Sequence, residues 1–170
     1  GVDPSDIANE IGPDVTVVNT VFPSSQASAI LPEKGFDIVT SIAMYYDLED
    51  PVGFAASISR LLKPEGVWAF EMSYLPLMLL QNSFDTICHE HLEYYSLAVL
   101  EDIAARAGLR IFKILVNNIN GGSIRCYACH AFSDKHGTAE DRALMHRLRT
   151  REFELELDTD RPYVDFQRRI

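Results

Sequence analysis

The sequence has few basic residues and no long apolar run, and each absence excludes a class of partner or of protein. Lysine and arginine number 15 against 25 aspartate and glutamate residues, so the formal net charge is -10. Nucleic acids and anionic membranes are bound by clustered Lys and Arg, and we therefore exclude both as direct partners. No apolar run approaches the roughly 20 residues that a spanning helix needs, and no basic stretch followed by an apolar one opens the chain. These features predict a cytoplasmic protein.

Cysteine is also scarce. Cys88, Cys126 and Cys129 form neither an even disulfide framework nor paired zinc-knuckle motifs. Cys126 and Cys129 have CxxC spacing, but their segment has the composition of a strand, on which positions three apart face opposite sides. We therefore predict buried apolar thiols in a reducing compartment rather than a metal or redox site.

The 170 residues, 47% of them hydrophobic, are enough for one globular domain of ordinary size and a tail. β-branched runs and helical spacing alternate along the first part of the chain. Strands are expected at 15–21, 36–42 and 67–72, and helices at 6–11, 51–62 and 96–107. This alternation is typical of an α/β fold with a mostly parallel sheet and right-handed crossovers.

The pattern changes after Gly108. Two β-rich runs, 109–116 and 123–132, are joined by a turn-forming segment and predict a C-terminal antiparallel hairpin. Beyond it the chain is charged and helical over 139–157, and the apolar residues of 163–170 have no evident partner in this sequence. We therefore expect one domain over 1–132 and the helical start of a second over 133–170.

The opening residues 1–5 have the composition of a strand end running into a helix, and we expect a further strand before them. In doubly wound folds a carboxylate at such a strand end accepts hydrogen bonds from the ribose of an adenosine cofactor. Asp3 is placed for this role, or alternatively for capping the next turn. Ile42, Ala43 and Met44 reach the carboxyl edge of the sheet, where ligands of this architecture bind, and are candidate cofactor contacts by place; packing is the competing interpretation.

The segment 84–96 has the highest concentration of side chains that can exchange protons. His89, Glu90 and His91 stand together there, and Tyr94 and Tyr95 follow them. Side chains of these types can move protons, so we interpret the segment as a catalytic loop. His-x-His also occurs in metal sites, but the further ligands that zinc or iron requires are not apparent nearby, and no metal is expected.

The segment 120–125 admits two interpretations. Its glycines suit a tight turn, which is the structural interpretation. Alternatively its backbone donors, Ser123 and Arg125 form a substrate site, in which the guanidinium pairs with a phosphate.

Taken in order, the segments 1–5, 35–40, 61–67, 84–96 and 120–125 resemble the NDP-hexose C-methyltransferase family of class I S-adenosylmethionine-dependent methyltransferases. The resemblance covers about residues 1–132. Leu-Leu-Lys-Pro-Glu-Gly at 61–66 is shared with most class I methyltransferases, whereas His-Glu-His-Leu-x-Tyr-Tyr-Ser and Gly-Gly-Ser are specific to the sugar family. The resemblance implies a three-layer Rossmann-like sheet, mostly parallel with a C-terminal antiparallel hairpin, here missing the first strand and its glycine-rich loop.

The family resemblance also implies roles for single residues. Asp3 matches the ribose-binding acid and His91 the general base, with Glu90 and His89 beside it. Cys88, Tyr94, Tyr95, Ser123 and Arg125 fall in the substrate site; sugar-acting members commonly carry Tyr where this chain has Cys88, so one phenol donor near the substrate carbonyl is missing. Family members also contain a zinc-binding N-terminal module and a Rossmann-like C-terminal domain, which we expect as partners within the same chain.

These observations lead to one hypothesis and two alternatives. The leading hypothesis is S-adenosylmethionine-dependent C-methylation next to a keto group of a deoxy-sugar nucleotide, with His91 removing the proton. The first alternative is a small-molecule O-methyltransferase of the same fold. The second is a noncatalytic fragment that does not bind cofactor and that associates through an exposed sheet edge.

Overall fold

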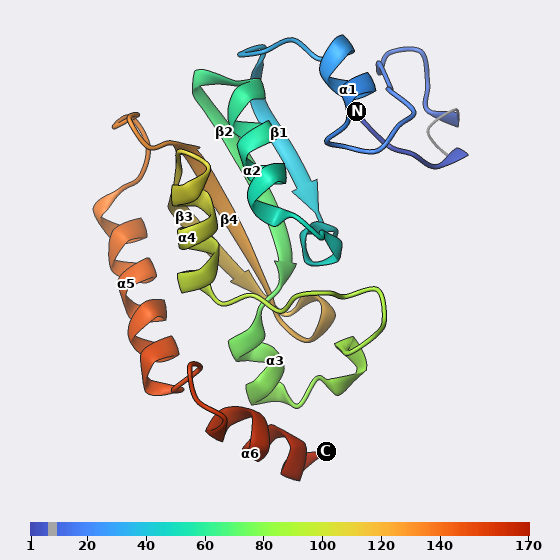
Figure 1. The fold of residues 1–170 in the computed structure, drawn as a ribbon. Helices are drawn as coiled ribbons and strands as arrows, with labels where there is room; N and C mark the ends of the chain where they lie inside the picture. The colour runs from blue at the N-terminus through green and yellow to red at the C-terminus, as the bar shows by residue number, and fades with distance from the viewer. Residues whose placement is uncertain (7–9) are drawn as a thin grey trace.

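The computed structural model describes residues 1–6 and 10–170, and its centre is one four-stranded sheet (Figure 1). In chain order the elements are α1 (Ser25–Ile30), β1 (Phe36–Ile42), the short 3-10 helix η2 (Tyr45–Asp47), α2 (Pro51–Leu61), β2 (Leu62–Ser73), α3 (Leu75–Gln81), η3 (Phe84–Thr86), α4 (Leu97–Arg106), β3 (Leu109–Asn117), η4 (Ile119–Gly121), β4 (Ser123–His130), α5 (Ala139–Glu154) and α6 (Arg161–Arg169). The helix expected over 6–11 includes residues 7–9 and lies outside the described residues.

The sheet has the strand order β1-β2-β4-β3. β1 pairs with β2 in parallel, while β4 is antiparallel to both of its neighbours. Three strands therefore point the same way, and the second strand of the C-terminal hairpin lies inside the sheet instead of at its edge. The α/β class expected from the sequence is confirmed, with a mixed sheet.

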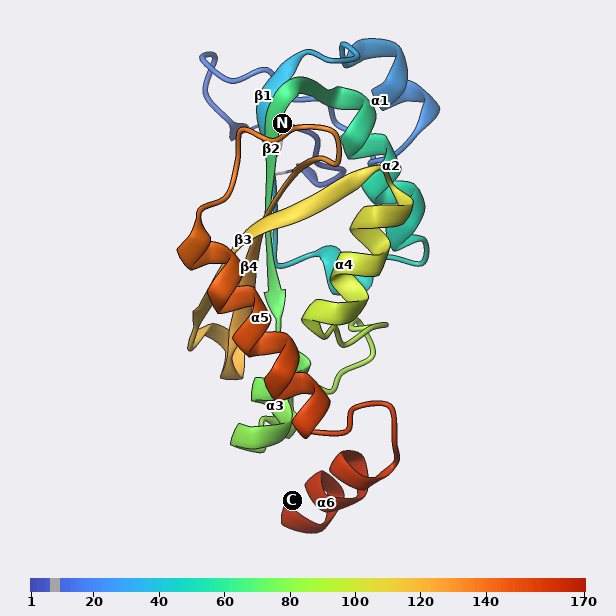
Figure 2. The same ribbon diagram turned by 90° about the vertical axis from the view of Figure 1, so that its left-hand side faces the viewer.

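The main core lies between the sheet and the two helices α2 and α4, which cover the same face (Figure 2). β2 presents Trp68, Phe70 and Met72 to this core, and all three are fully buried. The Trp68 and Phe70 rings stack with their centroids 4.0 Å apart, and the Trp68 indole donates to the Ser41 hydroxyl at 3.1 Å. Burial of each such side chain stabilises the fold by roughly 1.5–3 kcal/mol, so this layer fixes the position of β1 beside β2.

The opposite face of β1 is open. Ile38 is 67% exposed and Ile42 50% exposed, and no helix in the described part of the chain packs over them. Within the same residues no strand pairs with the outer edge of β1. Over β1 the described residues 1–6 and 10–170 therefore show no third layer, and the expectation of three layers is not confirmed there.

The strand predicted over 15–21 is also wrong. Only Val18 takes part in pairing, through a single parallel bridge to Val2, and Val15 and Val21 are largely exposed. β-branched composition indicates a fit to a half-buried sheet surface, and without a neighbouring strand it does not produce one.

The C-terminal residues have a partner in this chain, contrary to the expectation for 163–170. Phe166 of α6 is buried against Met78 and Leu79 of α3, a helix that the sequence patterns did not indicate. The Arg169 guanidinium donates to the Leu79 carbonyl at 2.7 Å. No helix among the described residues is both long and apolar enough to cross a bilayer.

One buried carboxylate joins α5 to the rest of the domain. Glu152 accepts hydrogen bonds from the Tyr74 hydroxyl at 2.6 Å, from the Leu97 amide at 2.5 Å and from the Ala98 amide at 3.1 Å. The two amides belong to the first turn of α4, which has no intrahelical acceptor for them. Glu152 therefore caps α4 from a distant helix.

We predict that Glu152→Ala lowers the free energy of unfolding by roughly 2–4 kcal/mol, because it leaves two buried donors and one partly buried donor without an acceptor. Glu154→Ala is the matched control, since Glu154 is exposed on the same helix. Urea denaturation of both variants measures the effect. Equal stability of the two would show that the carboxylate does not hold the helices together.

Candidate active site

Two loops meet at the carboxyl edge of the sheet. The first is the turn after β1, where Ala43 adopts a left-handed backbone with φ 54° and its amide donates to the Glu71 carbonyl at 2.9 Å. This bond directs the chain away from the sheet immediately after the strand. The predicted cofactor contacts Ile42, Ala43 and Met44 therefore lie together at the strand end, with Ile42 exposed and Met44 partly buried.

The second loop carries the histidines and is tied to the first by Tyr46. The Tyr46 carbonyl accepts the amides of Leu92 at 3.0 Å and Glu93 at 3.1 Å. Further along, Tyr95 bridges to Tyr74 at the end of β2. The loop is thus held on both sides, although it contains no helix or strand of its own after η3.

His91 is the predicted catalytic group with the most contacts to the rest of the protein. Its Nδ1 lies 2.8 Å from the Thr86 carbonyl oxygen, and its ring rests on the Tyr46 ring with centroids 4.1 Å apart. A carbonyl oxygen only accepts, so Nδ1 carries the proton and Nε2 keeps its lone pair. The side chain is half-buried, so the imidazole presents a basic nitrogen at the surface of a fixed ring.

The other members of the cluster point outward. His89 is 93% exposed and Glu90 74% exposed in their side chains, with 4.0 Å between the nearest nitrogen and oxygen. Cys88 is also exposed. The structure therefore separates His91, which has fixed partners, from three neighbours at the rim.

Tyr94 and Tyr95, the two tyrosines of this loop, differ in whether their hydroxyls have a hydrogen-bond partner. The Tyr94 hydroxyl donates to the Thr86 carbonyl at 3.1 Å, so this oxygen receives both Tyr94 and His91. Tyr95 is buried beside Tyr45, and its hydroxyl has no hydrogen-bond partner among the described residues. Burial raises the pKa of Tyr95 and keeps its hydroxyl protonated.

Arg125 and Ser123 lie on β4 and have partners within the protein. The Arg125 guanidinium pairs with the buried Glu71 carboxylate through Nε at 2.5 Å. The Ser123 hydroxyl donates to the Ile119 carbonyl at 2.8 Å. The Arg125 side chain is partly exposed, and besides Glu71 the Tyr127 hydroxyl contributes to the raised pKa of its guanidinium, whereas Ser123 is buried.

Asp3 forms a local turn at the N-terminal bridge. Its Oδ1 accepts from the Ser5 hydroxyl at 2.6 Å and from the Ser5 amide at 2.8 Å. The two bonds, the hydroxyl being the larger cause, hold the pKa of Asp3 below its ordinary value. The turn-capping role is therefore present, and Oδ2 remains open to a second donor.

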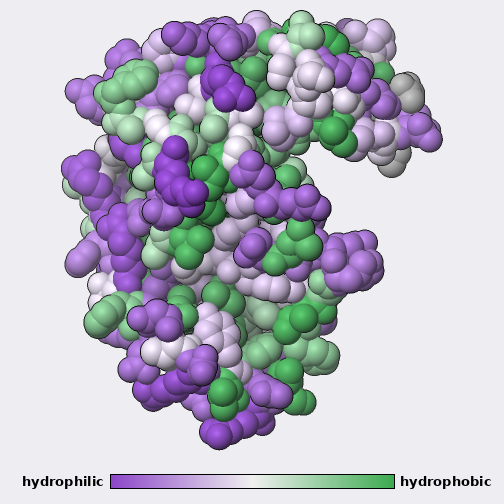
Figure 3. Space-filling view, in the orientation of Figure 1, coloured by the Kyte–Doolittle hydropathy of each residue, from purple (hydrophilic) through white to green (hydrophobic). Residues whose placement is uncertain are grey.

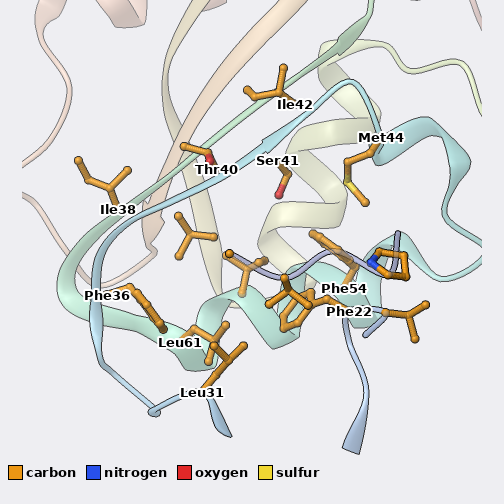
Figure 4. A pocket seen from close by; sticks show the side chains of 16 residues that line it. Phe22, Leu31, Phe36, Ile38, Thr40, Ser41, Ile42, Met44, Phe54 and Leu61 are labelled. Atoms are coloured by element: carbon orange, nitrogen blue, oxygen red, sulfur yellow. The ribbon is translucent and has the colours of Figure 1, made fainter. Parts of the chain in front are cut away.

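A cavity of about 560 Å³ lies between β1, α2 and the N-terminal segments (Figure 4). Its walls are aromatic and aliphatic, with Phe22, Phe36 and Phe54 among them, and Ile42 and Met44 reach it from the strand end. Figure 3 shows a hollow on one side of the molecule below the N-terminal segments. Neither Asp3 nor His91 lines this cavity, so the predicted cofactor and base residues do not all share one enclosed pocket.

Two further residues of the site come from the loop after β1, whose place at the sheet edge made all its residues candidates but gave none of them a role. Tyr46 supports the His91 ring, and Asp47 lies close enough for the imidazole to act on its carboxylate. Burial raises the pKa of Asp47, and the His91 charge opposes that shift. Both residues belong to the loop after the second predicted strand, so their place at the sheet edge was the available signal.

No group of three His, Cys, Asp or Glu side chains within residues 1–6 and 10–170 could hold a metal ion. Cys126 and Cys129 are both buried and unbonded to each other, in accord with the expectation of apolar thiols.

The chain is similar to known methyltransferases in sequence and in fold. Residues 1–114 match a family model described as a methyltransferase domain. The C-methyltransferase NovU of Streptomyces niveus is 32% identical over 139 residues, which are 79% of this chain and 33% of NovU. The chain thus spans about a third of the length of the curated relative it matches.

Solved structures share the fold at lower identity. An S-adenosylmethionine-dependent methyltransferase from Aquifex aeolicus is 18% identical with a TM-score of 0.54, covering 75% of this chain and 65% of that one. The 1,6-didemethyltoxoflavin-N1-methyltransferase of Burkholderia thailandensis, with its bound substrate and S-adenosylhomocysteine, is 13% identical with a TM-score of 0.55, covering 76% of this chain and 59% of that one.

The first prediction for the site concerns the His91 tautomer. Long-range nitrogen–proton NMR of the neutral imidazole should show the proton on Nδ1, because the Thr86 carbonyl accepts it. His89 is the internal control, since its exposed ring should show a mixture dominated by the other tautomer. A proton found on Nε2 of His91 would contradict the geometry.

The second prediction for the site concerns the pKa of Asp3. Ser5→Ala removes the stronger of its two hydrogen bonds, so the pKa of Asp3 should rise toward the ordinary value for aspartate. Carboxyl carbon NMR titration measures it, with Ser28→Ala, a change at an exposed serine of α1, as the control. An Asp3 pKa that does not move would exclude the turn as its cause.

Proposed function

We propose that this chain, which belongs to the methyltransferase domain family, serves in an S-adenosylmethionine-dependent C-methyltransferase acting next to a keto group of a deoxy-sugar nucleotide. Two findings support the reaction type. The relative at 32% identity carries the name C-methyltransferase, and the chain presents a fixed imidazole at the edge where ligands of this fold bind.

The observation that carries the proposal is the 2.8 Å contact between His91 Nδ1 and the Thr86 carbonyl. Methylation at carbon requires removal of a C–H proton, which a base must receive at a defined position. With Nδ1 committed to the carbonyl, Nε2 is the nitrogen that accepts. Asp47 is close enough to favour the imidazolium that results.

In this mechanism His91 Nε2 takes the proton of the carbon next to the ketone, and the electron pair of that C–H bond moves onto the carbonyl oxygen as an enolate. S-adenosylmethionine, when bound, would supply the electrophilic methyl group for the enolate carbon, its own sulfur being the leaving group. The Tyr46 ring and the Thr86 carbonyl keep the imidazole in one orientation throughout. Positioned proton transfer of this kind contributes roughly a hundredfold to ten thousandfold in rate.

Four predicted residues fit the cofactor in part: three at the end of β1, and Asp3 near the N-terminus. Ile42 and Met44 offer apolar surface for an adenine ring, and Asp3 keeps Oδ2 open for a ribose hydroxyl. Ala43, with its left-handed backbone, leaves the strand end uncovered by a long side chain. We assign cofactor binding to these four residues.

The substrate contacts are assigned from the rim of the histidine loop. Cys88, His89 and Glu90 are exposed there and suit the sugar, with the two carboxylate oxygens of Glu90 able to accept from its hydroxyls. Tyr94 lies beside the base. Arg125, whose side chain is partly exposed, suits the nucleotide phosphates. Tyr95 and Ser123, which the sequence also offered as substrate contacts, are buried, and we leave them out of the proposed substrate site.

The deciding experiment is deuterium exchange at the carbon next to the ketone, measured by NMR with a keto-deoxy-sugar nucleotide in heavy water. His91→Ala should slow the exchange at least a hundredfold, because the base is lost, while S-adenosylmethionine still binds. His146→Ala is the control, since His146 is exposed on α5 far along the chain from the loop.

Unchanged exchange in His91→Ala, with normal exchange in the parent protein, would overturn the assignment of the base. Methylation of an oxygen without any carbon exchange would instead identify an O-methyltransferase. Absence of cofactor binding by calorimetry would indicate a chain that does not catalyse methyl transfer by itself.

A further inference from the structure

A second cavity, of about 270 Å³, lies between β3 and α5. It opens near the first residues of β3, which runs parallel to β1 and β2. The histidine loop and the β1 turn lie at the opposite ends of these strands. The cavity is therefore separate from the proposed methyl-transfer site.

Positive charge gathers in this cavity although the whole chain carries -10. Arg110 from β3 and Arg142 and Arg149 from α5 line it, together with His136. Its floor is apolar, formed by the buried side chains of Ile111 and Met145. Guanidinium groups brought together over apolar atoms repel one another unless an anion lies between them.

Arg110 is held in place without losing its charge. Its Nε and Nη2 donate to the Ser133 carbonyl at 3.0 Å and 2.6 Å, and Nη2 also donates to the His136 carbonyl at 3.1 Å. All three bonds go to neutral oxygens. The guanidinium is thus ordered by the loop after β4, and no carboxylate among the described residues forms an ion pair with it.

The two arginines of α5 differ. Arg149 donates through two nitrogens to Glu101, at 2.7 Å and 2.5 Å, and this carboxylate offsets its charge. Arg142 is exposed, and no hydrogen bond or ion pair of its side chain is found within residues 1–6 and 10–170. The Arg142 guanidinium is therefore a cation of the cavity without a counter-charge of its own.

His136, which also lines the cavity, is held by packing and by a hydrogen bond. The His136 ring stacks on Phe112 with centroids 4.9 Å apart, and its Nε2 donates to the Glu65 carbonyl at 3.1 Å. Gly137 follows with φ 95°, a backbone that disfavours other residues. The neighbouring acid Asp141 is engaged, because its Oδ2 accepts from the amide and hydroxyl of Thr138.

We propose that this cavity binds a phosphate-sized oxyanion, as inorganic phosphate or as the terminal group of a small phosphomonoester. The Nη1 group of Arg110, which donates to no acceptor among the described residues, and the Arg142 guanidinium can both donate to the oxygens of such a dianion, with Arg149 at the edge. The volume lies just below the range of about 300–1,000 Å³ typical of pockets for larger ligands, which favours a single phosphoryl group. This site goes beyond the proposed methyl transfer and does not depend on it.

The test is titration of the protein with inorganic phosphate and, in a second arm, with glycerol 3-phosphate, followed by amide NMR and calorimetry. Saturable shifts should concentrate at 110–112, 136–137 and 142. Tighter binding of the monoester would identify a metabolite as the source of the anion, and tighter binding of the free ion would identify phosphate itself; either supports the site.

Arg142→Gln should weaken binding roughly tenfold or more, because it removes a charge-assisted contact without disturbing the loop that Arg110 holds. Arg147→Gln is the matched control: it removes the same charge from an exposed position of α5 that does not line the cavity. Absence of saturable shifts in the parent, or equal weakening in the two variants, would overturn the proposal.

Discussion

The hydrogen bond from His91 to the Thr86 carbonyl is the interaction on which the functional account depends. It assigns the proton to one ring nitrogen and the lone pair to the other, which a freely rotating histidine at the surface would not do. Tyr46 reinforces the arrangement from below the ring, and through its own carbonyl it ties the histidine loop to the turn after β1. The base and the expected cofactor edge are thus joined through one residue.

The rest of the fold holds these two loops beside each other. β1 and β2 are aligned by the packed layer of Trp68 and Phe70 beneath α2 and α4, so their carboxyl ends stay side by side. Glu152 then fixes the start of α4, directly after the histidine loop, by capping its first amides. A carboxylate contributed by α5 therefore connects residues beyond 132 to the helix that follows the histidine loop.

Sequence patterns predicted the elements that have local signals. β1 and the hairpin strands follow from β-branched runs, and α2 and α4 from helical spacing. The structure adds Asp50 and Ser96 as the N-caps of these two helices. The patterns failed where tertiary context decides: the segment 15–21 is β-branched but has no sheet to join, and α3 is a continuous apolar run without helical periodicity. The packing of Phe166 on α3 links residues almost ninety apart and has no local trace.

The same limit applies to the site. His91, its neighbours and Asp3 could be chosen from residue type and position at a strand end. Tyr46 could not be ranked above the other aromatics of its loop, because stacking and carbonyl acceptance depend on how two loops meet. Nor could sequence distinguish Arg125, which pairs with Glu71, from Arg110, whose charge has only neutral acceptors.

The central claim, that the His91 imidazole is itself the proton acceptor, can be tested most directly by comparing two pH titrations on one sample. The first follows the rate of deuterium uptake at the substrate carbon without cofactor, and the second follows the His91 ring-proton shift in the same complex. The account predicts that both follow one curve with a common midpoint. Two curves with separate midpoints would contradict it and assign the proton transfer to another group.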